Sequence, residues 1–264
     1  MCLIIVKGKG VEKPTTEIIK KAYTANDDLC GISYLKPHGK LLECYRGLTL
    51  NELIEINEDI EDSFNVMYHF RIATSGNVNV LNAHPFPLYQ NKMKVHTRPK
   101  ITLAHNGITK GIGNQKYSDT SILVQYIEDN HLDYDFLLTL LSSNGGGKFA
   151  VLDLELAGIM LYGEFTESKS GLLFSNMYWK TDYTADWSAW NAATHTWDYD
   201  IDDKTSISGL CDVCQQSADI LTLDRGIYLC EACLTWEIDH YKHVKEKMED
   251  DDCTSDRGIE VPND

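Results

Sequence analysis

The sequence predicts an α+β protein with mostly antiparallel strands, followed by a small cysteine-rich module. Three observations support this class. Apolar runs of strand length are mixed with segments of helical periodicity throughout the first 180 residues. Three strand-like segments follow one another just before residue 180 without a helix between them, as in antiparallel hairpins. Two Cys-x-x-Cys pairs occur after residue 210.

Helices are predicted where apolar side chains recur at helical spacing, in several cases behind a capping residue. The expected helical ranges are 15–23, capped by Thr15 or Thr16, 49–57, 119–128, capped by Ser118, and 134–142. Short apolar or alternating runs predict strands over 2–6, 65–73, 101–105, 148–154, 157–165 and 171–179. Residues 144–147 are interpreted as a turn, because no Lys-Ser or Lys-Thr pair follows in the register of a phosphate loop.

The charge of the chain is concentrated at its C-terminal end. The 264 residues carry a formal charge of -16, yet residues 1–180 hold 18 basic and 20 acidic side chains. The last 84 residues hold 6 basic and 20 acidic ones. Because no basic run is present, the composition argues against binding to duplex nucleic acid or to anionic lipid. We expect a cytoplasmic protein, since neither a signal peptide nor an apolar run of membrane-spanning length is visible.

This charge pattern suggests four parts. They are a near-neutral body over 2–180, an acidic Trp-rich linker over 181–209, a cysteine module over 210–248 and an acidic tail over 249–264. The linker holds Trp187, Trp190 and Trp197. Two interpretations stay open for them: they pack back onto the body, or they form a docking segment, for which Trp is a favoured anchor.

Cys2 follows the initiator Met directly, so removal of Met1 would leave a residue with both a thiol and a free α-amine. The amine titrates near roughly 7.7–8.0 and is able to take the thiol proton at neutral pH. This is the arrangement of an N-terminal nucleophile. By itself the residue means little, because a small thiol at the start of a strand is commonly part of the core.

Three further segments carry chemistry-bearing residues in order. The first is His69-Phe-Arg-Ile-Ala-Thr-Ser-Gly76, which continues to Asn82-Ala-His-Pro-Phe86. The second is Leu103-Ala-His-Asn-Gly-Ile108, and the third is Ser118-Asp-Thr120. Together with the Met-Cys start, these segments resemble the class II glutamine amidotransferases, whose glutaminase domain belongs to the N-terminal nucleophile (Ntn) hydrolases. The resemblance covers about residues 2–180 and implies a four-layer αββα sandwich with antiparallel sheets.

The resemblance also implies a role for each matching residue. Cys2 would attack the glutamine amide, and Asn106 and Gly107 would form the oxyanion hole. Arg71 would bind the α-carboxylate and Asp119 the α-ammonium, while Thr74 and Ser75 would line the glutamine pocket. His69, His84 and His105 are interpreted as structural, because this mechanism needs no histidine. Leu3, Ile72 and Ser75 differ from the residues that many members carry.

The function implied is that of a glutaminase-type subunit that passes ammonia to a separate synthase. No acceptor-activating domain is visible, because the chain has no phosphate loop and little length after residue 180. Compact chains of this kind resemble those encoded by bacteriophages as well as cellular ones. Two alternatives stay open: hydrolysis of another amide without ammonia transfer, and a catalytically idle scaffold that binds proteins.

The cysteine module has the spacing of a four-thiolate zinc site. Cys211 and Cys214 are separated by fifteen residues from the second pair, Cys230 and Cys233. Residues 219–229 read as a hairpin that turns at 224–226, and helical spacing follows Cys233. The pattern predicts a zinc-ribbon or treble-clef-like module with structural Zn²⁺. Residues 211–248 hold 4 basic and 7 acidic side chains, which favours a protein partner over nucleic acid.

Overall fold

The computed structural model describes residues 2–36, 41–109, 112–145 and 147–180, together with three strands over 207–210, 217–224 and 227–229. The chain divides into two units, Met1–Asp203 and Lys204–Asp264. The first unit is a mixed α+β structure in which every strand pairing is antiparallel, as the sequence predicted.

The larger sheet of the first unit has seven strands, with β1 in its interior between β11 and β4. In spatial order the strands are β10 (Thr166–Glu167), β11 (Leu173–Phe174), β1 (Leu3–Lys7), β4 (Asn65–Phe70), β2 (Cys30–Leu35), β3 (Leu42–Leu48) and β6 (His96–Thr97). Every residue of β1 is buried. The strand that begins directly after Cys2 is therefore held on both sides and anchors the N-terminus in the middle of the sheet.

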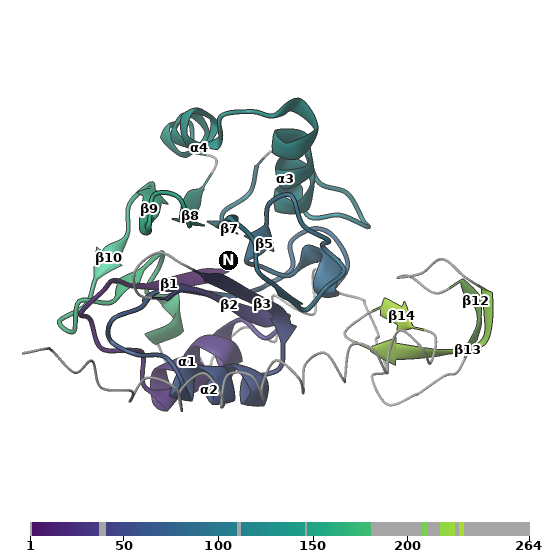
Figure 1. Ribbon diagram of the computed structural model, residues 1–264, viewed down its shortest axis with the longest axis horizontal. Coiled ribbons are helices and arrows are strands. Elements are labelled where there is room, and N and C mark those ends of the chain that lie inside the picture. Colours follow the sequence, from purple (N-terminus) through teal and green to yellow (C-terminus); the bar gives the residue numbers. More distant parts are fainter. Residues whose placement is uncertain are drawn as a thin grey trace, which may run out of the picture. The chain divides into compact units, whose positions relative to one another are not determined.

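The smaller sheet lies over one face of the larger one (Figure 1). In spatial order its strands are β5 (Phe86–Pro87), β7 (Ile101–Asn106), β8 (Lys148–Asp153) and β9 (Gly158–Tyr162). Ile4 and Met67 of the larger sheet share an apolar cluster with Ala104 and Ala150 of the smaller one. Small alanines on one side and larger aliphatic side chains on the other allow the two sheets to pack closely.

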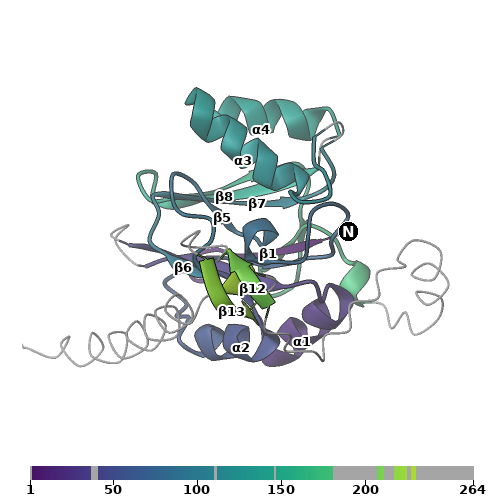
Figure 2. The same cartoon turned by 90° about the vertical axis from the view of Figure 1, so that its right-hand side faces the viewer.

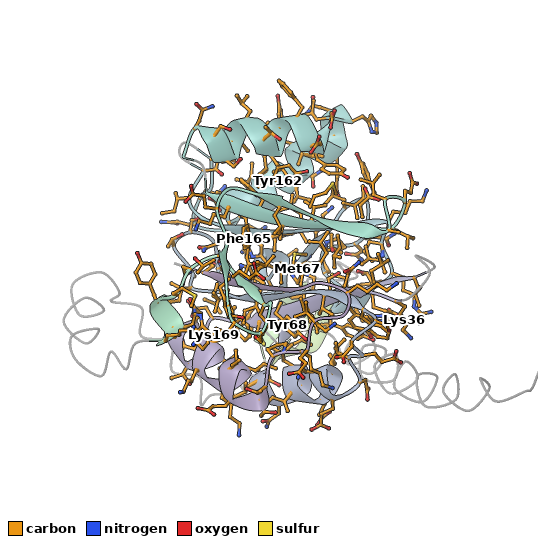
Figure 3. All side chains as sticks on the ribbon, turned by 90° about the vertical axis from the view of Figure 1, so that its left-hand side faces the viewer. Lys36, Met67, Tyr68, Tyr162, Phe165 and Lys169 are labelled. Carbon is orange, nitrogen blue, oxygen red and sulfur yellow. The ribbon has the colours of Figure 1, made fainter. Side chains whose placement is uncertain are left out.

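Successive side chains of a strand point to opposite faces, and β4 shows this directly. Figure 3 places Met67 toward the smaller sheet and Tyr68 on the other face. The Tyr68 hydroxyl donates to Asn57 Oδ1 of a covering helix at 2.7 Å. One strand thus ties both neighbouring layers together.

Two helix pairs cover the outer faces of the two sheets (Figures 1 and 2). The pair over the larger sheet is α1 (Thr16–Ala25) and α2 (Leu50–Glu58), and the pair over the smaller sheet is α3 (Asp119–Asn130) and α4 (Tyr134–Ser143). Short 3₁₀ turns span Val80–Asn82 (η2) and Tyr178–Lys180 (η3). Thr15, Thr49 and Ser118 cap α1, α2 and α3 through their side chains, so the predicted Ser118 cap is confirmed.

The structure corrects three details of the predicted elements. The strand expected over 65–73 ends at Phe70, where the chain turns into the loop that carries Arg71. The strand expected over 171–179 is limited to β11. Beyond it, the Ser175 side chain accepts the Ile4 N–H and the Asn176 side chain donates to the Cys2 carbonyl oxygen. Strands β2 and β3 were not predicted from the sequence.

The second unit contains a three-stranded antiparallel sheet in the order β12 (Ile207–Leu210), β13 (Ser217–Asp224) and β14 (Ile227–Leu229). The pairing of β13 with β14 confirms the hairpin predicted over 219–229. The sheet begins at Ile207, three residues before the predicted module boundary. Within the described ranges, no helix has both the length and the apolar character needed to cross a membrane.

Candidate active site

Cys2 lies at the start of β1 and is partly buried. Its Sγ is 3.4 Å from both the N–H and the carbonyl oxygen of Ile72. Its own carbonyl oxygen accepts a hydrogen bond of 2.7 Å from Asn176 Nδ2. The Ile72 backbone and the Asn176 side chain, from two distant segments, therefore fix the predicted nucleophile.

A small pocket includes Cys2, and its walls come from five separate stretches of the chain. It is lined by Cys2, Arg71, Ile72, Thr74, Ser75, His84, His105, Gly107, Ser118, Asp119 and Thr120. Six of the seven residues predicted for catalysis and glutamine binding are among them. The seventh, Asn106, is buried next to Gly107, and its side chain is bonded to Ser175.

Arg71 organises the loop that forms one wall of the pocket. Its guanidinium is buried and donates to the carbonyl oxygens of Ser75 at 2.9 Å and of Asn77 at 3.1 Å. Burial lowers the pKa of Arg71, while the negative groups Asp28 and Asp119 act in the opposite direction. A guanidinium has five N–H donors in a rigid fork, so loop anchoring and recognition of a carboxylate are compatible roles.

Asp28 is a site residue that the sequence analysis missed. Its Oδ2 accepts the N–H of Ala73 at 2.8 Å, and its own N–H donates to the Arg71 carbonyl oxygen at 3.0 Å. Asp28 thus fixes the backbone of residues 71–73, which leads to the pocket residues Thr74 and Ser75. No sequence signal marked it, because Asp27-Asp28 has the composition of an ordinary turn.

Asp119 begins helix α3 and is held rigidly in the pocket wall. Its Oδ2 accepts the N–H of Thr109 at 2.7 Å, and its Oδ1 accepts the N–H of Thr120 at 2.8 Å. A carboxylate in the first turn of a helix is also stabilised by the helix dipole. The pocket therefore presents a fixed anion from Asp119 and a fixed cation from Arg71, together with the Cys2 thiol.

The protonation state of Cys2 follows from its surroundings. Desolvation raises the pKa of the Cys2 thiol, and the Asp119 carboxylate adds to that rise. The hydrogen bond from Ile72 and the charge of Arg71 act against it but do not reverse it. Because the thiolate is the nucleophilic form, Cys2 needs a base that removes its proton during attack.

Gly147 precedes strand β8 and lies close to Asn106 and Gly107, the residues of the predicted oxyanion hole. Its φ is +112°, and an added Cβ would lie 2.5 Å from His105 Nε2, 2.8 Å from Gly107 Cα and 2.9 Å from the Asn106 carbonyl oxygen. No side chain fits in this space. Gly147, the last residue of the run interpreted as a turn, therefore lets the chain approach Asn106 and Gly107 closely.

Three buried histidines lie where the two sheets meet, and two of them, His84 and His105, also line the pocket. The rings of His69 and His84 stack with centroids 4.0 Å apart. His69 Nε2 is 3.1 Å from the His105 carbonyl oxygen, and His105 Nδ1 is 2.9 Å from Thr120 Oγ1. Burial lowers the pKa of His69 to about 3 and the pKa of His84 well below its ordinary value. Both rings are therefore neutral at pH 7.

This neutrality predicts that the protein loses stability below pH 6.5. An unfolded histidine binds a proton with a pKa near roughly 6.5, whereas the folded His69 does not until about pH 3. The unfolded state then binds more protons, so the free energy of unfolding should fall by up to about 1.4 kcal/mol per pH unit for each such ring. Urea unfolding at several pH values between 6.5 and 5 measures this slope.

The variant His69→Gln should make the slope shallower, because one buried titrating group is removed. The matched control is His131→Asn, which removes an exposed histidine at the end of α3 in place of a buried one. An equal slope in the wild type and in His69→Gln would contradict the conclusion that His69 is buried in its neutral form.

Cys30 and Cys44 are buried thiols with no place in the pocket. The Cys44 Sγ lies 3.6 Å from the Pro85 carbonyl oxygen, and burial raises the pKa of this thiol to about 12. A thiol with such a pKa is unreactive at pH 7. The two residues therefore belong to the core.

The four predicted zinc ligands, Cys211, Cys214, Cys230 and Cys233, lie outside the described residues. Among the residues that are described, no group of three or more His, Cys, Asp or Glu side chains is arranged to hold a metal. Strand β12 ends one residue before Cys211, and β14 ends one residue before Cys230.

No protein-family model matches the chain, and no curated protein matches it in sequence.

Proposed function

We propose that the chain is a class II glutamine amidotransferase-type glutaminase that uses Cys2 as its nucleophile. One observation carries the proposal: the Cys2 thiol, the Arg71 guanidinium and the Asp119 carboxylate line a single pocket. Glutamine has an α-carboxylate that would pair with Arg71, an α-ammonium that would pair with Asp119, and a neutral amide that Cys2 would attack. The stacking of two antiparallel sheets between two helix pairs supports the further proposal that the first unit is an Ntn-hydrolase αββα sandwich.

The reaction starts after removal of Met1, which leaves Cys2 with a free α-amine. The ordinary pKa of such an amine, roughly 7.7–8.0, makes it a suitable base near neutral pH for the Cys2 thiol, whose pKa is raised by desolvation. The amine takes the thiol proton while Sγ attacks the side-chain amide carbon. A C–S bond forms, and the carbonyl oxygen becomes an oxyanion.

The oxyanion would lie close to the Gly107 N–H and the Asn106 amide. Each such donor contributes roughly 3–4 kcal/mol to the transition state in other enzymes. The C–N bond then breaks, and the nitrogen takes the proton from the α-amine and leaves as ammonia. Water adds to the thioester, which releases glutamate and restores the thiol.

The direct test is to incubate the mature protein with glutamine and to measure glutamate and ammonia. Equimolar release supports the proposal, as does a glutamyl thioester seen by mass spectrometry in acid-quenched samples. A panel of γ-glutamyl amides tested in parallel distinguishes the alternative of another amide substrate. Failure to release glutamate from every member of the panel would overturn the proposed activity.

The C-terminal unit is proposed to hold structural Zn²⁺ through four thiolates and to bind a protein partner that uses the ammonia. The spacing of the two Cys-x-x-Cys pairs supports this proposal, because each pair is able to chelate one metal and four thiolates close a tetrahedral site. Strands β12 and β14 are both antiparallel to β13 and run in the same direction, with Leu210 opposite Ser217 and Leu229 opposite Thr222. In the sequence, one cysteine pair directly follows each of these two strands.

The zinc proposal predicts about one zinc ion per chain, measured by elemental analysis of the purified protein. The variants Cys211→Ser and Cys230→Ser should each lose most of this zinc, because three thiolates close the tetrahedral site poorly. Cys253→Ser is the matched control, since this cysteine lies in the tail outside both pairs, and it should keep the metal. Full zinc content in all three variants would show that the pairs are not the ligands.

A further inference from the structure

Ser175 connects strand β1 to the predicted oxyanion residue. The side chain is 1% exposed, and its Oγ accepts the Ile4 N–H at 2.8 Å. The Ser175 N–H in turn donates to the Ile4 carbonyl oxygen at 3.0 Å. The same Oγ lies 2.8 Å from the side-chain amide nitrogen of Asn106. A single hydroxyl thus bridges the strand that begins after Cys2 and the end of β7.

The hydrogen-bond donors and acceptors of this bridge do not match: one hydroxyl hydrogen and one amide oxygen both lack a partner. A serine hydroxyl has one hydrogen to give and two lone pairs. The Ile4 N–H occupies one lone pair, so the hydrogen stays available for an acceptor. Asn106 Oδ1 is buried and has no hydrogen-bond partner, while Asn106 Nδ2 faces the hydroxyl. An unpaired buried amide oxygen costs about 1–3 kcal/mol.

A half-turn of the Asn106 amide gives the Ser175 hydrogen an acceptor. The oxygen and nitrogen of such an amide have nearly the same shape, and the hydrogen-bond network decides which is placed where. After the exchange, the Ser175 hydroxyl donates to Asn106 Oδ1. The Asn106 NH₂ group then takes the buried position in which Oδ1 now lacks a partner, so its N–H groups have no acceptor until an oxyanion forms.

We propose that Ser175 is a positioning residue that accepts the Ile4 N–H, donates to Asn106 Oδ1 and thereby directs the Asn106 amide hydrogens to the oxyanion formed at Cys2. The inference rests on the proposed Cys2 chemistry. The neighbouring Asn176 supports it, because its side chain holds the Cys2 carbonyl oxygen at 2.7 Å. One dipeptide after β11 thus orients both the nucleophile and the oxyanion donor.

The bridge is also fixed from its other side. Lys148 Nζ donates to the Ser175 carbonyl oxygen at 2.7 Å, and Lys148 pairs with Asn106 across strands β7 and β8. The turn that carries Ser175 is therefore anchored to the same strand pair that carries Asn106. Such rigid support is what preorganised oxyanion donors require.

Two reactions of Cys2 separate positioning from folding in the variant Ser175→Ala. Acylation by p-nitrophenyl acetate passes through an oxyanion, whereas alkylation by iodoacetamide does not. We expect the acylation rate to fall by about 10- to 100-fold, which is less than for outright loss of an oxyanion donor, and the alkylation rate to stay within about twofold. Ser170→Ala, an exposed serine between β10 and β11, is the matched control and should change neither rate.

A double-mutant cycle with Asn106→Ala tests whether Ser175 acts through Asn106. In the Asn106→Ala background, Ser175→Ala should cause no further loss in the ratio of acylation to alkylation. Additive losses, or an unchanged ratio in Ser175→Ala alone, would overturn the proposal. If Ser175→Ala does not fold, Ser175→Cys retains the volume with a weaker donor and should show a smaller loss of the same kind.

The ester reaction does not depend on glutamine, so the two proposals fail separately. A wild type that is acylated by the ester but releases no glutamate from glutamine would overturn the glutaminase function, and the Ser175 ratio would still be decisive. A wild type that is alkylated but never acylated at Cys2 would overturn the Ser175 proposal together with the function on which it rests.

Discussion

Cys2→Ala is expected to release no glutamate above background, while the fold stays intact. The thiol forms the only covalent bond between protein and substrate in the proposed mechanism. Loss of a catalytic nucleophile in other hydrolases costs on the order of 10⁶-fold in kcat. The side chain is small and partly exposed, so its truncation removes little packing. Glutamate release and the urea-unfolding midpoint, measured on the same preparation, check both halves of this expectation.

Cys30→Ala is the matched control, because this buried thiol lies outside the pocket. It should lose some stability but keep its kcat. The opposite pattern, with activity surviving in Cys2→Ala, would rule out the thioester.

The α-amine of Cys2 is tested by keeping the thiol and blocking the amine. A chain with one uncleaved residue before Cys2 should still be alkylated at the thiol but should lose about 10²- to 10⁴-fold in kcat, as expected for removal of a general base. The intact mass of each preparation shows which N-terminus is present. Full activity with a blocked N-terminus would assign the base to another group.

Asp119→Asn is expected to lower kcat/KM for glutamine by about 30- to 1000-fold. Removal of one partner from a buried charge pair costs about 2–4 kcal/mol, which corresponds to this range. The Asp119 carboxylate also accepts the N–H groups of Thr109 and Thr120, so the variant disturbs the pocket wall as well. A substrate that lacks the α-ammonium separates the two effects.

Glutaramate is such a substrate, since it keeps the carboxylate and the amide. The wild type should prefer glutamine over glutaramate strongly, and Asp119→Asn should lose most of that preference. Asp129→Asn, on the exposed face of the same helix, is the control and should keep it. An equal loss on both substrates would assign Asp119 a structural role only.

Local features were predicted well because their causes lie within a few residues. The Ser118 cap satisfies a backbone N–H three positions away, and Thr15 caps the start of α1 in the same way. The hairpin of β13 and β14 likewise follows from two short strand segments around one turn. Such signals are contained in the sequence.

Strands β2 and β3 were missed because both of their faces are buried. Neither shows the alternation of a half-exposed strand, and β3 contains the buried charged residues Glu43 and Arg46. Glu43 is acceptable there because His96 lies 2.6 Å and Arg98 3.0 Å from its carboxylate oxygens. Those partners come from more than fifty positions away, so the local pattern does not reveal them.

The segment over 171–179 shows the opposite error. Its apolar residues predicted a strand, yet only Leu173–Phe174 pairs with β1. The two polar residues that follow are needed for contacts with Ile4, Asn106 and Cys2. Tertiary hydrogen bonds thus overrode a strand propensity.

By itself, the sequence determined the α+β class, the capped helices, the charge division and the residues with the chemistry of a Cys2 site. Only the tertiary structure decided how that site is held together. Asp28, Ser175 and Asn176 reach across 45, 69 and 174 positions to make their bonds, and desolvation by surrounding residues raises the pKa of Cys2. Hydrogen bonds and desolvation depend on distances in space, and folding alone sets those distances.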